Sequence, residues 1–464
     1  MREYRNLVLS ALSGFFLWTA FAPFEFWPGS FLGAATLFIT LRDQDFKARL
    51  LFALISGFTF FAPLLHWSGV YVGSLPWLAL TSLETALFSA IALIRINRDF
   101  HSVLRFAALF TLIELFRMKF PFGGFGWGRV GFTQTDSLSH LYPLIGVTGV
   151  SFFTILFASA LVQRNTRLIV SFLLVLMITT IWQPQTTMTK TIQIDAIQGG
   201  VDQLGLDFNA RALSVLNRHV LVTQSIKKPG NLVIWPENAS DLDPIKNEEA
   251  ARLLKEALSS VNRLILVGAV EQGSRGPANS SLLFSPEGKV LSRYVKQDLA
   301  PFGEYIPLRP VSEFFAGQAK TVTNFIPGEK WIPHSVEGMR FTSFICFEVL
   351  DDDHVRNGAQ GSNFLVAQTN NATFGRSPQS SQQLQITRAR SAELIREFAV
   401  VSTTGWSAHI DSRGRVDSRL PQFTPGYLSM NLQGMAGSSP ASRLRSWHWA
   451  IFLAFALAFT RRRI

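Results

Sequence analysis

The sequence contains a single cysteine and few charged residues. Because Cys346 stands alone among 464 residues, an intramolecular disulfide framework and a thiolate metal cluster are both excluded. Charged residues make up 16% of the chain, against about 25% in typical soluble domains. A long basic run interleaved with aromatic residues is also missing, so we expect no nucleic-acid partner despite the net charge of +11. Basic residues in such a chain more often set membrane topology or attract anionic lipid.

Apolar and aromatic residues are in excess: 48% of the chain is hydrophobic, with 41 Phe and 11 Trp. A membrane-spanning helix needs about 20 apolar residues, with a usual range of about 17–25. The shorter runs at 27–41 and 447–460 also fit interfacial or re-entrant segments. We predict a membrane α-helical bundle of about eight transmembrane helices, from apolar runs at 7–22, 27–41, 50–72, 75–94, 103–116, 141–162, 167–182 and 447–460.

Basic residues in the short loops predict the orientation of these helices. Residues 1–22 resemble a secretory signal peptide, but further apolar runs follow at once. With a cytoplasmic N-terminus, the outside loops before residue 184 carry only Arg117, Lys119 and Arg129. The inside segments carry Arg2, Arg5, Arg42, Lys47, Arg49, Arg95, Arg98, Arg105, Arg164, Arg167 and Arg461 to Arg463. The positive-inside rule then predicts that both termini are cytoplasmic and that the block 184–445 is extracytoplasmic.

That block has the composition of an α/β domain. Short apolar runs alternate in it with helix-like stretches such as NEEAARLLKEALSSV (247–261). The runs are TIQIDAIQ (191–198), NLVIWPE (231–237), RLILVGAV (263–270) and FTSFICFE (341–348). Buried strands separated by helices indicate a sheet covered on both faces. We therefore divide the chain into an N-terminal transmembrane domain (1–183), an extracytoplasmic α/β domain (184–445) and a C-terminal transmembrane helix with a basic tail (446–464).

Three polar residues stand at or near the ends of apolar runs in the α/β block: Glu237, Lys296 and Cys346. Open α/β sheets place ligand-contacting groups at strand ends. Each residue also fits a structural role, since free cysteine packs as a small hydrophobe, Glu237 fits a helix start and Lys296 fits a solvated surface.

Taken together, the three residues make chemical sense. A thiol attacks as the thiolate, which a nearby carboxylate can generate and a lysine can stabilise together with the oxyanion formed on attack. Activation by histidine is less favoured, because His219, His334 and His354 occur in no recognisable motif. The single thiol is therefore interpreted as a nucleophile, provided that Glu237 and Lys296 converge on it.

Longer motifs around these residues resemble a known family. The segments WPEN (235–238), YVKQDLAPFGEYIP (294–307) and ICFE (345–348) are similar to the Glu-Lys-Cys signatures of the nitrilase (carbon–nitrogen hydrolase) superfamily. FAPFEFWP (21–28), FGWGRVGFTQTDS (125–137) and ARSAELIREFAVVSTTGWSAHID (389–411) resemble segments of its membrane branch, the apolipoprotein N-acyltransferase family. The resemblance implies a nitrilase-like αββα sandwich in the block, and a bacterial inner membrane as its location.

Carried over by position, the resemblance implies roles for individual residues. Glu237 would be the general base, Lys296 the electrostatic stabiliser and Cys346 the acyl-accepting nucleophile. Glu304 would support the lysine and the thiol, and Glu348 would be a carboxylate held near the site. Positions associated with shaping the site or the lipid entrance are Trp235, Asn279 and Trp127.

The chain departs from the family pattern at three positions. Phe347 follows the cysteine where many relatives carry Tyr, so a hydroxyl is missing. TNNATFG (369–375) stands where SNDAWFG-like sequences are usual, which gives Asn371 for Asp and Thr373 for Trp. These changes put lid or acceptor contacts in doubt but leave the three proposed catalytic residues in place.

The implied reaction is acyl transfer within a membrane. Cys346 would attack an acyl ester of a membrane phospholipid, and the α-amino group of a diacylglyceryl-cysteine lipoprotein would then take the chain from the thioester. We expect no metal and no organic cofactor, because no ligand cluster or phosphate-binding glycine loop is present in the sequence. Two alternatives stay open: a membrane-tethered amidase or acyl hydrolase of the same class, and a non-enzymatic lipid or lipoprotein carrier.

Overall fold

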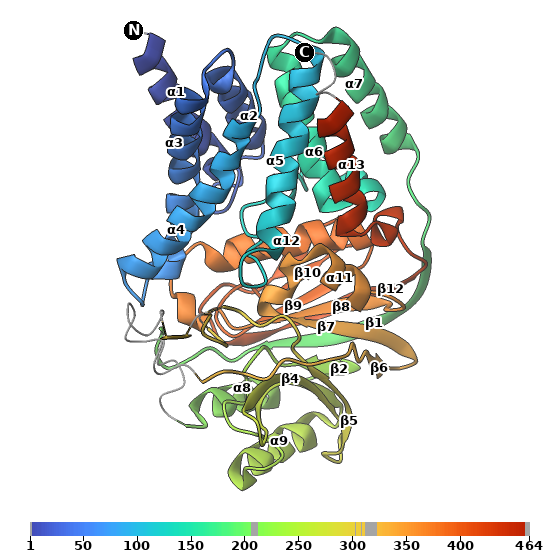
Figure 1. Ribbon diagram of the computed structural model, residues 1–464. Helices are drawn as coiled ribbons and strands as arrows, with labels where there is room; N and C mark the ends of the chain where they lie inside the picture. The colour runs from blue at the N-terminus through green and yellow to red at the C-terminus, as the bar shows by residue number, and fades with distance from the viewer. Residues whose placement is uncertain (1, 206–211, 302, 308, 311–322, 460–464) are drawn as a thin grey trace. The chain divides into compact units, whose positions relative to one another are not determined.

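The computed structural model describes residues 2–205, 212–301, 303–307, 309–310 and 323–459 (Figure 1). The chain divides into two compact units, Met1–Pro184 with Ser439–Ile464 and Gln185–Ser438. The first unit is helical and the second is built on two β-sheets. The basic tail Arg461 to Arg463, which entered the topology prediction, lies outside the described residues.

Each of the eight predicted apolar runs falls on a helix of the first unit. The helices are α1 Arg2–Thr19, α2 Pro28–Leu41, α3 Phe46–Leu64, α4 Ser74–Phe88, α5 Phe100–Lys119, α6 Tyr142–Val162, α7 Thr166–Ile181 and α13 Ser446–Phe459. Among the described residues, Phe46–Leu64, Ser74–Leu93 and Ser139–Val162 are long and apolar enough to cross a membrane. Shorter apolar helices are Pro28–Leu41, Thr166–Ile181 and Ser446–Ala458. The count of eight spans therefore stays a prediction.

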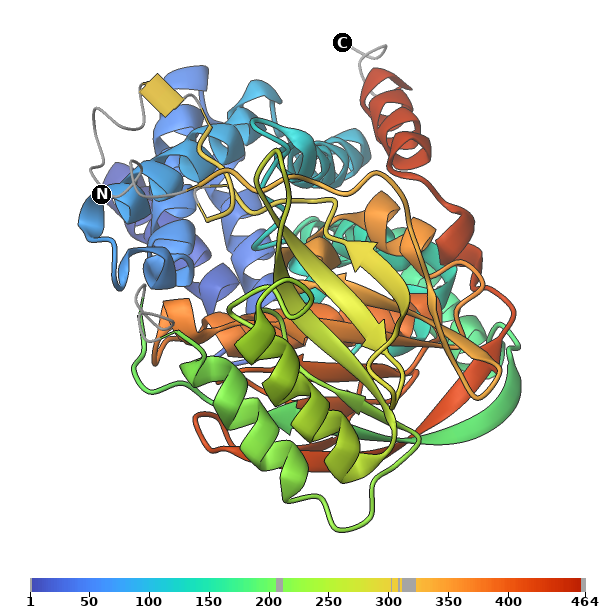
Figure 2. The same ribbon diagram turned by 90° about the horizontal axis from the view of Figure 1, so that it is seen from below.

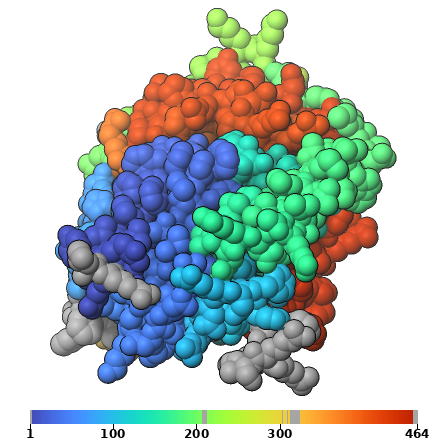
Figure 3. All heavy atoms as spheres, turned by 90° about the horizontal axis from the view of Figure 1, so that it is seen from above, coloured from blue at the N-terminus to red at the C-terminus, as the bar shows by residue number. Residues whose placement is uncertain are grey.

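The helices of the first unit pack against neighbours both near and far along the chain. Helix α1 contacts α2 and α3, α6 contacts α2, α5 and α7, and α13 returns to α5. Figure 3 shows the atoms of the first three helices in one contiguous blue region. Helices α3, α5 and α7 each begin behind a residue whose side-chain oxygen accepts a backbone N–H three positions later, namely Asp45, Asp99 and Asn165.

The second unit contains two six-stranded mixed sheets. The first runs β12-β1-β2-β3-β4-β5 and comprises Gly426–Ala436, Thr187–Gln198, Leu232–Ile234, Leu264–Gln272, Pro277–Phe284 and Val290–Val295. The second runs β11-β10-β9-β8-β7-β6 and comprises Val416–Arg419, Ala408–Ile410, Phe398–Ser402, Phe364–Thr369, Met339–Ile345 and His334–Val336. Strands β1, β2 and β3 are parallel, as are β7, β8 and β9, and the flanking strands pair antiparallel.

Alternation along the strands explains why the sheets are buried on both sides. In β2, Leu232 and Ile234 pack into the apolar core shared with Phe341 and Val366 of the second sheet. Val233 points the other way, into the core under α8 (Ser214–Gln224) and α9 (Glu248–Val261). Figure 2 shows these two helices side by side over the first sheet. On the second sheet, α11 (Asp352–Gly358) contacts β7 and α12 (Gln379–Leu394) contacts β9, which gives the predicted αββα layering.

Both ends of helix α9 are set by residues that can be recognised in the sequence. The side chain of Asn247 accepts the backbone N–H of Ala250 at 2.9 Å, and two glutamates occupy the first turn. Buried residues recur every three or four positions, which places one apolar face on the sheet. The helix ends at Asn262, whose φ of 49° is left-handed, as expected at a C-terminal cap. The predicted helix 247–261 therefore agrees with the structure.

Candidate active site

Three of the predicted site residues lie just beyond strands of the second unit. Glu237 stands three residues after β2, Lys296 directly after β5 and Cys346 directly after β7. Glu237 is 5% exposed and Lys296 1% exposed, whereas Cys346 is partly exposed. The structure thus rules out the solvated-surface interpretation of Lys296, because its whole side chain is buried.

Lys296 is held between two buried carboxylates. Its Nζ lies 3.3 Å from Glu237 Oε1 and 2.8 Å from Glu304 Oε2. Asn279, on β4, closes the ring, because its Nδ2 donates to Glu237 Oε1 at 2.7 Å and to Glu304 Oε1 at 2.8 Å. Buried charges are tolerated when they are paired and hydrogen-bonded in this way. The structure therefore brings Glu237, Lys296, Glu304 and Asn279 together.

Backbone N–H groups also hold both carboxylates. The N–H of Asn370 donates to Glu237 Oε2 at 2.9 Å, and the N–H of Ala300 donates to Glu304 Oε2 at 2.8 Å. Each carboxylate is thus held by at least three groups, so its direction is set by the fold. A carboxylate with a fixed direction is suited to proton transfer at one defined place.

The charges in this ring act on one another and on the thiol. Burial raises the pKa of Glu237, and Glu304 adds to the rise while Lys296 opposes it. For Lys296, burial lowers the pKa, but the nearby Glu304, Glu237 and Cys346 raise it by more. The net pKa is raised, so the ammonium stays charged. Burial raises the pKa of the Cys346 thiol, as does the charge of Glu237, while Lys296 lowers it. The thiol is therefore held protonated at rest, with Glu237 and Lys296 acting on it in opposite directions.

Cys346 lies in a strained turn. Its φ is 53°, in the left-handed region that non-glycine residues rarely occupy, and it begins a short 3₁₀ helix, Cys346–Leu350. Such strain costs on the order of 1–3 kcal/mol and clusters at functional positions. Gln383 of α12 holds the turn, because its Nε2 donates to the Cys346 carbonyl at 3.0 Å and lies 3.8 Å from the sulfur.

Glu348 lies outside the ring around Lys296 and forms a separate buried network next to it. The side chain is 0% exposed, and Oε1 accepts the Tyr294 hydroxyl at 2.7 Å. His354 is paired with it, because Nε2 lies 3.2 Å from Glu348 Oε1 and Nδ1 lies 3.2 Å from Asp298 Oδ2. Trp331 stacks on Tyr294 with ring centroids 4.8 Å apart, which covers this network with an apolar surface.

The two tryptophans that the resemblance singled out lie in packed interiors. The indole of Trp235 sits in the core under α8 and α9, where Nε1 donates to Thr223 Oγ1 at 2.9 Å. Trp127 belongs to the helical unit, where it packs 5.0 Å from Trp67 and its carbonyl accepts from Arg117 at 2.8 Å. Their contact with substrate stays a prediction.

Residues that sequence reasoning missed hold the site from the side of α12 and β8. Gln383 and the backbone N–H of Asn370 both contact the proposed catalytic residues. His354 was considered only as a base and set aside, whereas the structure pairs it with Glu348. A glutamine in a helix and a backbone N–H carry no signal in a single sequence.

The three departures from the family pattern lie in the turn of the cysteine and in the segment after β8. Phe347 is half-buried in the 3₁₀ turn of the cysteine, and Thr373 is half-buried in the short turn Ala372–Phe374. Asn371 is 3% exposed and takes part in a hydrogen-bond network with Gln383. Nothing in the structure explains the change at Thr373.

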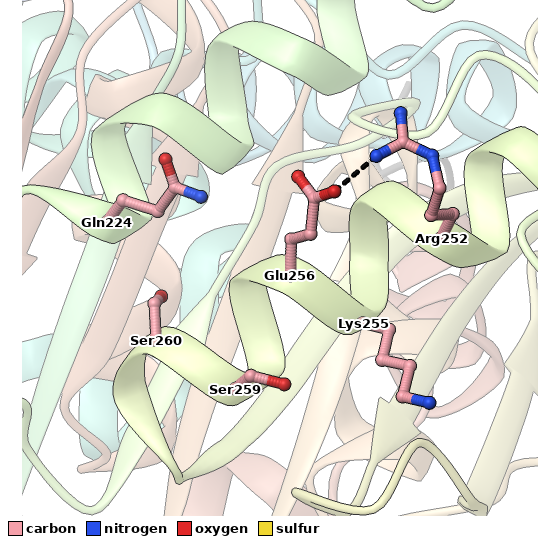
Figure 4. Close-up of a pocket in the computed structure, with 6 residues that line it drawn as sticks. All are labelled: Gln224, Arg252, Lys255, Glu256, Ser259 and Ser260. Atoms are coloured by element: carbon pink, nitrogen blue, oxygen red, sulfur yellow. Dashed lines mark hydrogen bonds and ion pairs between the residues drawn. The ribbon is translucent and has the colours of Figure 1, made fainter.

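A surface hollow between α8 and α9 is separate from these residues. It is lined by Gln224, Arg252, Lys255, Glu256, Ser259 and Ser260 (Figure 4). Arg252 is paired there with Glu256 and Glu249 of its own helix, as is usual for a solvated helix face. Within the described part of the chain, no group of three His, Cys, Asp or Glu side chains is arranged to hold a metal ion.

Sequence comparisons cover both units. Residues 13–160 match the family model of the apolipoprotein N-acyltransferase N-terminal domain, and residues 203–440 match that of carbon-nitrogen hydrolase. An apolipoprotein N-acyltransferase of Mycolicibacterium smegmatis is 31% identical, over 93% of this chain and 80% of the relative. That of Haemophilus influenzae is 28% identical, over 100% of this chain and 97% of the relative.

Among solved structures, a CN-hydrolase superfamily protein from Xanthomonas campestris aligns with a TM-score of 0.41. It is 16% identical and covers 57% of this chain and 96% of its own.

Proposed function

The chain belongs to the apolipoprotein N-acyltransferase family, and we propose that it moves an acyl chain from a membrane phospholipid to the N-terminal amine of diacylglyceryl-cysteine lipoproteins. The observation that carries the proposal is the buried ring of Glu237, Lys296, Glu304 and Asn279, whose charges act on the single thiol, Cys346. A lipid carrier would need none of these groups.

In the first half of the reaction, Glu237 takes the proton of Cys346 and the thiolate attacks the ester carbonyl of the phospholipid. The S–C bond forms and the C–O bond of the ester breaks. Glu237 returns the proton to the leaving alkoxide, which departs as a lysophospholipid. The Lys296 ammonium stabilises the negative charge first on sulfur and then on the tetrahedral oxygen.

In the second half, the free α-amine of the lipoprotein attacks the thioester. The C–N bond forms, the C–S bond breaks and the departing sulfur regains a proton. Glu237 is suited to accept the proton that the amine loses, which its raised pKa favours. Glu304 and Asn279 keep both Lys296 and Glu237 in place through these steps. All steps use side chains of this protein, and the proposal includes no metal and no cofactor.

The proposal includes a location. We place eight membrane spans in residues 1–183 and 446–464, both termini in the cytoplasm, and residues 184–445 outside the cytoplasm at the bacterial inner membrane. The charge asymmetry of the short loops supports this topology, and so does the coincidence of the eight apolar runs with helices. A donor dissolved in the bilayer and an acceptor anchored in it explain why the hydrolase unit is joined to a helical one.

A transfer assay tests the proposed function against the alternatives. Purified protein in vesicles of phosphatidylethanolamine and phosphatidylglycerol is given a diacylglyceryl lipopeptide with a free amine. We expect an N-acylated peptide, detected by mass spectrometry. Free fatty acid without amide product would instead identify a hydrolase of the same class. Lipid or peptide bound without chemistry would identify a carrier.

A further inference from the structure

A chain of side-chain amides leads from Cys346 to Asn371. Gln383 Nε2 donates to the Cys346 carbonyl at 3.0 Å and faces the sulfur at 3.8 Å. Gln383 Oε1 accepts from Asn371 Nδ2 at 2.9 Å. Both side chains are nearly fully buried, with 4% and 3% exposure, so water does not compete freely for these bonds.

The direction of both amides follows from their partners. The Cys346 carbonyl can only accept, so Gln383 must present its NH₂ to the cysteine and its oxygen to Asn371. Asn371 must then present its own NH₂ to Gln383. Its oxygen faces the hydroxyls of Thr369 at 3.0 Å and Ser402 at 2.6 Å, which can both donate. The network has one self-consistent direction, and it ends with an N–H aimed at the thiol.

We propose that Gln383 is a catalytic hydrogen-bond donor to the Cys346 sulfur and that Asn371 is the positioning residue that fixes its direction. The inference rests on the proposed function, in which this sulfur is the nucleophile. The sulfur carries negative charge before it attacks the ester and again when the amine displaces it from the thioester. An uncharged donor stabilises the thiolate at both moments and leaves the proton free to travel through Glu237. The hydrogen bond from Gln383 also opposes the effect of burial, which raises the pKa of the thiol.

The same network explains the departure at position 371. An ionised aspartate there could only accept hydrogen bonds. If the Gln383 amide kept its direction, a carboxylate oxygen of the aspartate would face Gln383 Oε1, another acceptor. If the amide turned round, Oε1 would face the Cys346 carbonyl instead. Both arrangements oppose two acceptors in a buried place, and the second also removes the N–H from the sulfur. Asn371 and Gln383 are therefore a matched pair, and an aspartate at position 371 would weaken the hydrogen bond from Gln383 to the sulfur.

Alkylation of the protein by iodoacetamide, followed by mass spectrometry of the peptide that carries residue 346, tests the inference, because Cys346 is the only cysteine. The variants are Gln383→Leu, Asn371→Asp and the two combined, with the full-length protein in vesicles. We expect each single variant to shift the pH profile of alkylation upwards and to slow the reaction at pH 7 about tenfold, as the loss of one hydrogen bond to a charged group predicts. Ser381→Ala is the control, since Ser381 lies on the same helix and accepts from Trp406 instead.

The double variant separates positioning from simple charge repulsion. If Asn371 acts through Gln383, adding Asn371→Asp to Gln383→Leu changes the profile little, whereas a pure charge effect would add in full. Gln383→Glu keeps the side-chain shape should leucine prevent insertion, and it should shift the profile in the same direction. Unchanged profiles in the Gln383 variants, with normal thioester formation in the parent, would overturn this inference alone. Failure of the parent protein to form any Cys346 adduct with phospholipid would instead overturn the proposed function.

Discussion

The carboxylate of Glu348 accepts a hydrogen bond of 2.8 Å from the backbone N–H of Ile345, the residue directly before Cys346. Its other oxygen accepts the N–H of Gln297, the residue directly after Lys296, also at 2.8 Å. One buried carboxylate thus joins the turn of the nucleophile to the loop of the lysine. Because both hydrogen bonds come from backbone groups, Glu348 fixes the backbone from which the side chains of Cys346 and Lys296 extend.

Glu348→Gln should therefore weaken both the fold and the reaction. The amide keeps the shape but turns one acceptor into a donor that faces N–H groups, which costs about 1–3 kcal/mol for a buried group. We expect a lower Tm and at least a tenfold loss of kcat with little change in KM. Glu337→Gln is the matched control, because Glu337 is half-exposed and paired with exposed Lys190. An unchanged kcat in Glu348→Gln would show that the two loops hold their places without it.

Glu237→Gln, Lys296→Ala and Cys346→Ala should each abolish acyl transfer while the protein still inserts into the membrane. Residues that act as one unit lose most activity when any member is removed. Lys296→Ala should also lower the Tm, because it leaves Glu237 and Glu304 buried without their cation. Transfer to a lipopeptide and the membrane-extracted yield are the measurements. A Cys346→Ala protein with near-normal turnover would return the cysteine to a packing role.

The pair of His354 and Glu348 should make stability depend on pH. For His354, burial lowers the pKa, but Glu348 and Asp298 outweigh it and the net pKa is raised. Its contribution is then fully present below the ordinary histidine pKa of about 6.5 and is lost as the pH rises through the raised value. For Glu348, burial raises the pKa, but His354 and hydrogen bonds outweigh it and the net pKa is lowered. Its contribution is present above about pH 4.3 and is lost on acidification through the lowered value.

We therefore expect the Tm difference between the parent and His354→Gln to be largest between about pH 5 and 6 and to shrink towards pH 8. His409 also has a raised pKa, since burial is outweighed by Glu397 and Asp417, but its effect is common to both proteins and cancels in the difference. Thermal unfolding at a series of pH values measures this. A difference that is constant from pH 5 to 8 would mean that His354 is not charged in the fold.

The sequence predicted the strands that end before Glu237 and Cys346, because buried parallel strands leave continuous apolar runs. Strand β5, which ends before Lys296, pairs antiparallel at the edge of its sheet and leaves no such run. The motifs, rather than any periodicity, supplied Glu304 and Glu348. What no pattern supplied is the amide of Gln383, which meets Cys346 only through the packing of a helix that lies further along the chain. The resemblance gave Asn279 as a residue that shapes the site or the lipid entrance, and the structure places its amide between two carboxylates.

Membrane orientation can be tested without the active site. Fusions of a phosphatase that is active only outside the cytoplasm, placed after Arg164 and after Thr187, should report opposite sides, with activity only for the second. The physical reason is the arginine excess of the predicted inside loops. The two sites flank α7, so a single apolar helix separates the reporters. Cytoplasmic signals from both fusions would refute the topology and with it the extracytoplasmic placement of residues 184–445.

The order of the two half-reactions gives the last prediction. One thiol and one carboxylate act on an ester and on an amine, so the transfer should proceed through a covalent intermediate that splits it into two easier steps. Protein incubated with phospholipid alone should accumulate a thioester at Cys346, visible by intact mass and cleaved by neutral hydroxylamine. Because Cys346 is the only cysteine, an adduct that neutral hydroxylamine cleaves is assigned to it.

The acceptor should then decide the fate of this intermediate. A diacylglyceryl lipopeptide with a free amine should remove the acyl chain from Cys346, whereas the same peptide with its amine blocked should leave it in place, since only a free amine is nucleophilic enough to attack the thioester. Gln383→Leu should slow both the appearance and the removal of the adduct, because the sulfur is charged at the start of one step and at the end of the other. Product formed under rapid quench without any adduct, or an adduct found on Lys296, would contradict the two-step order.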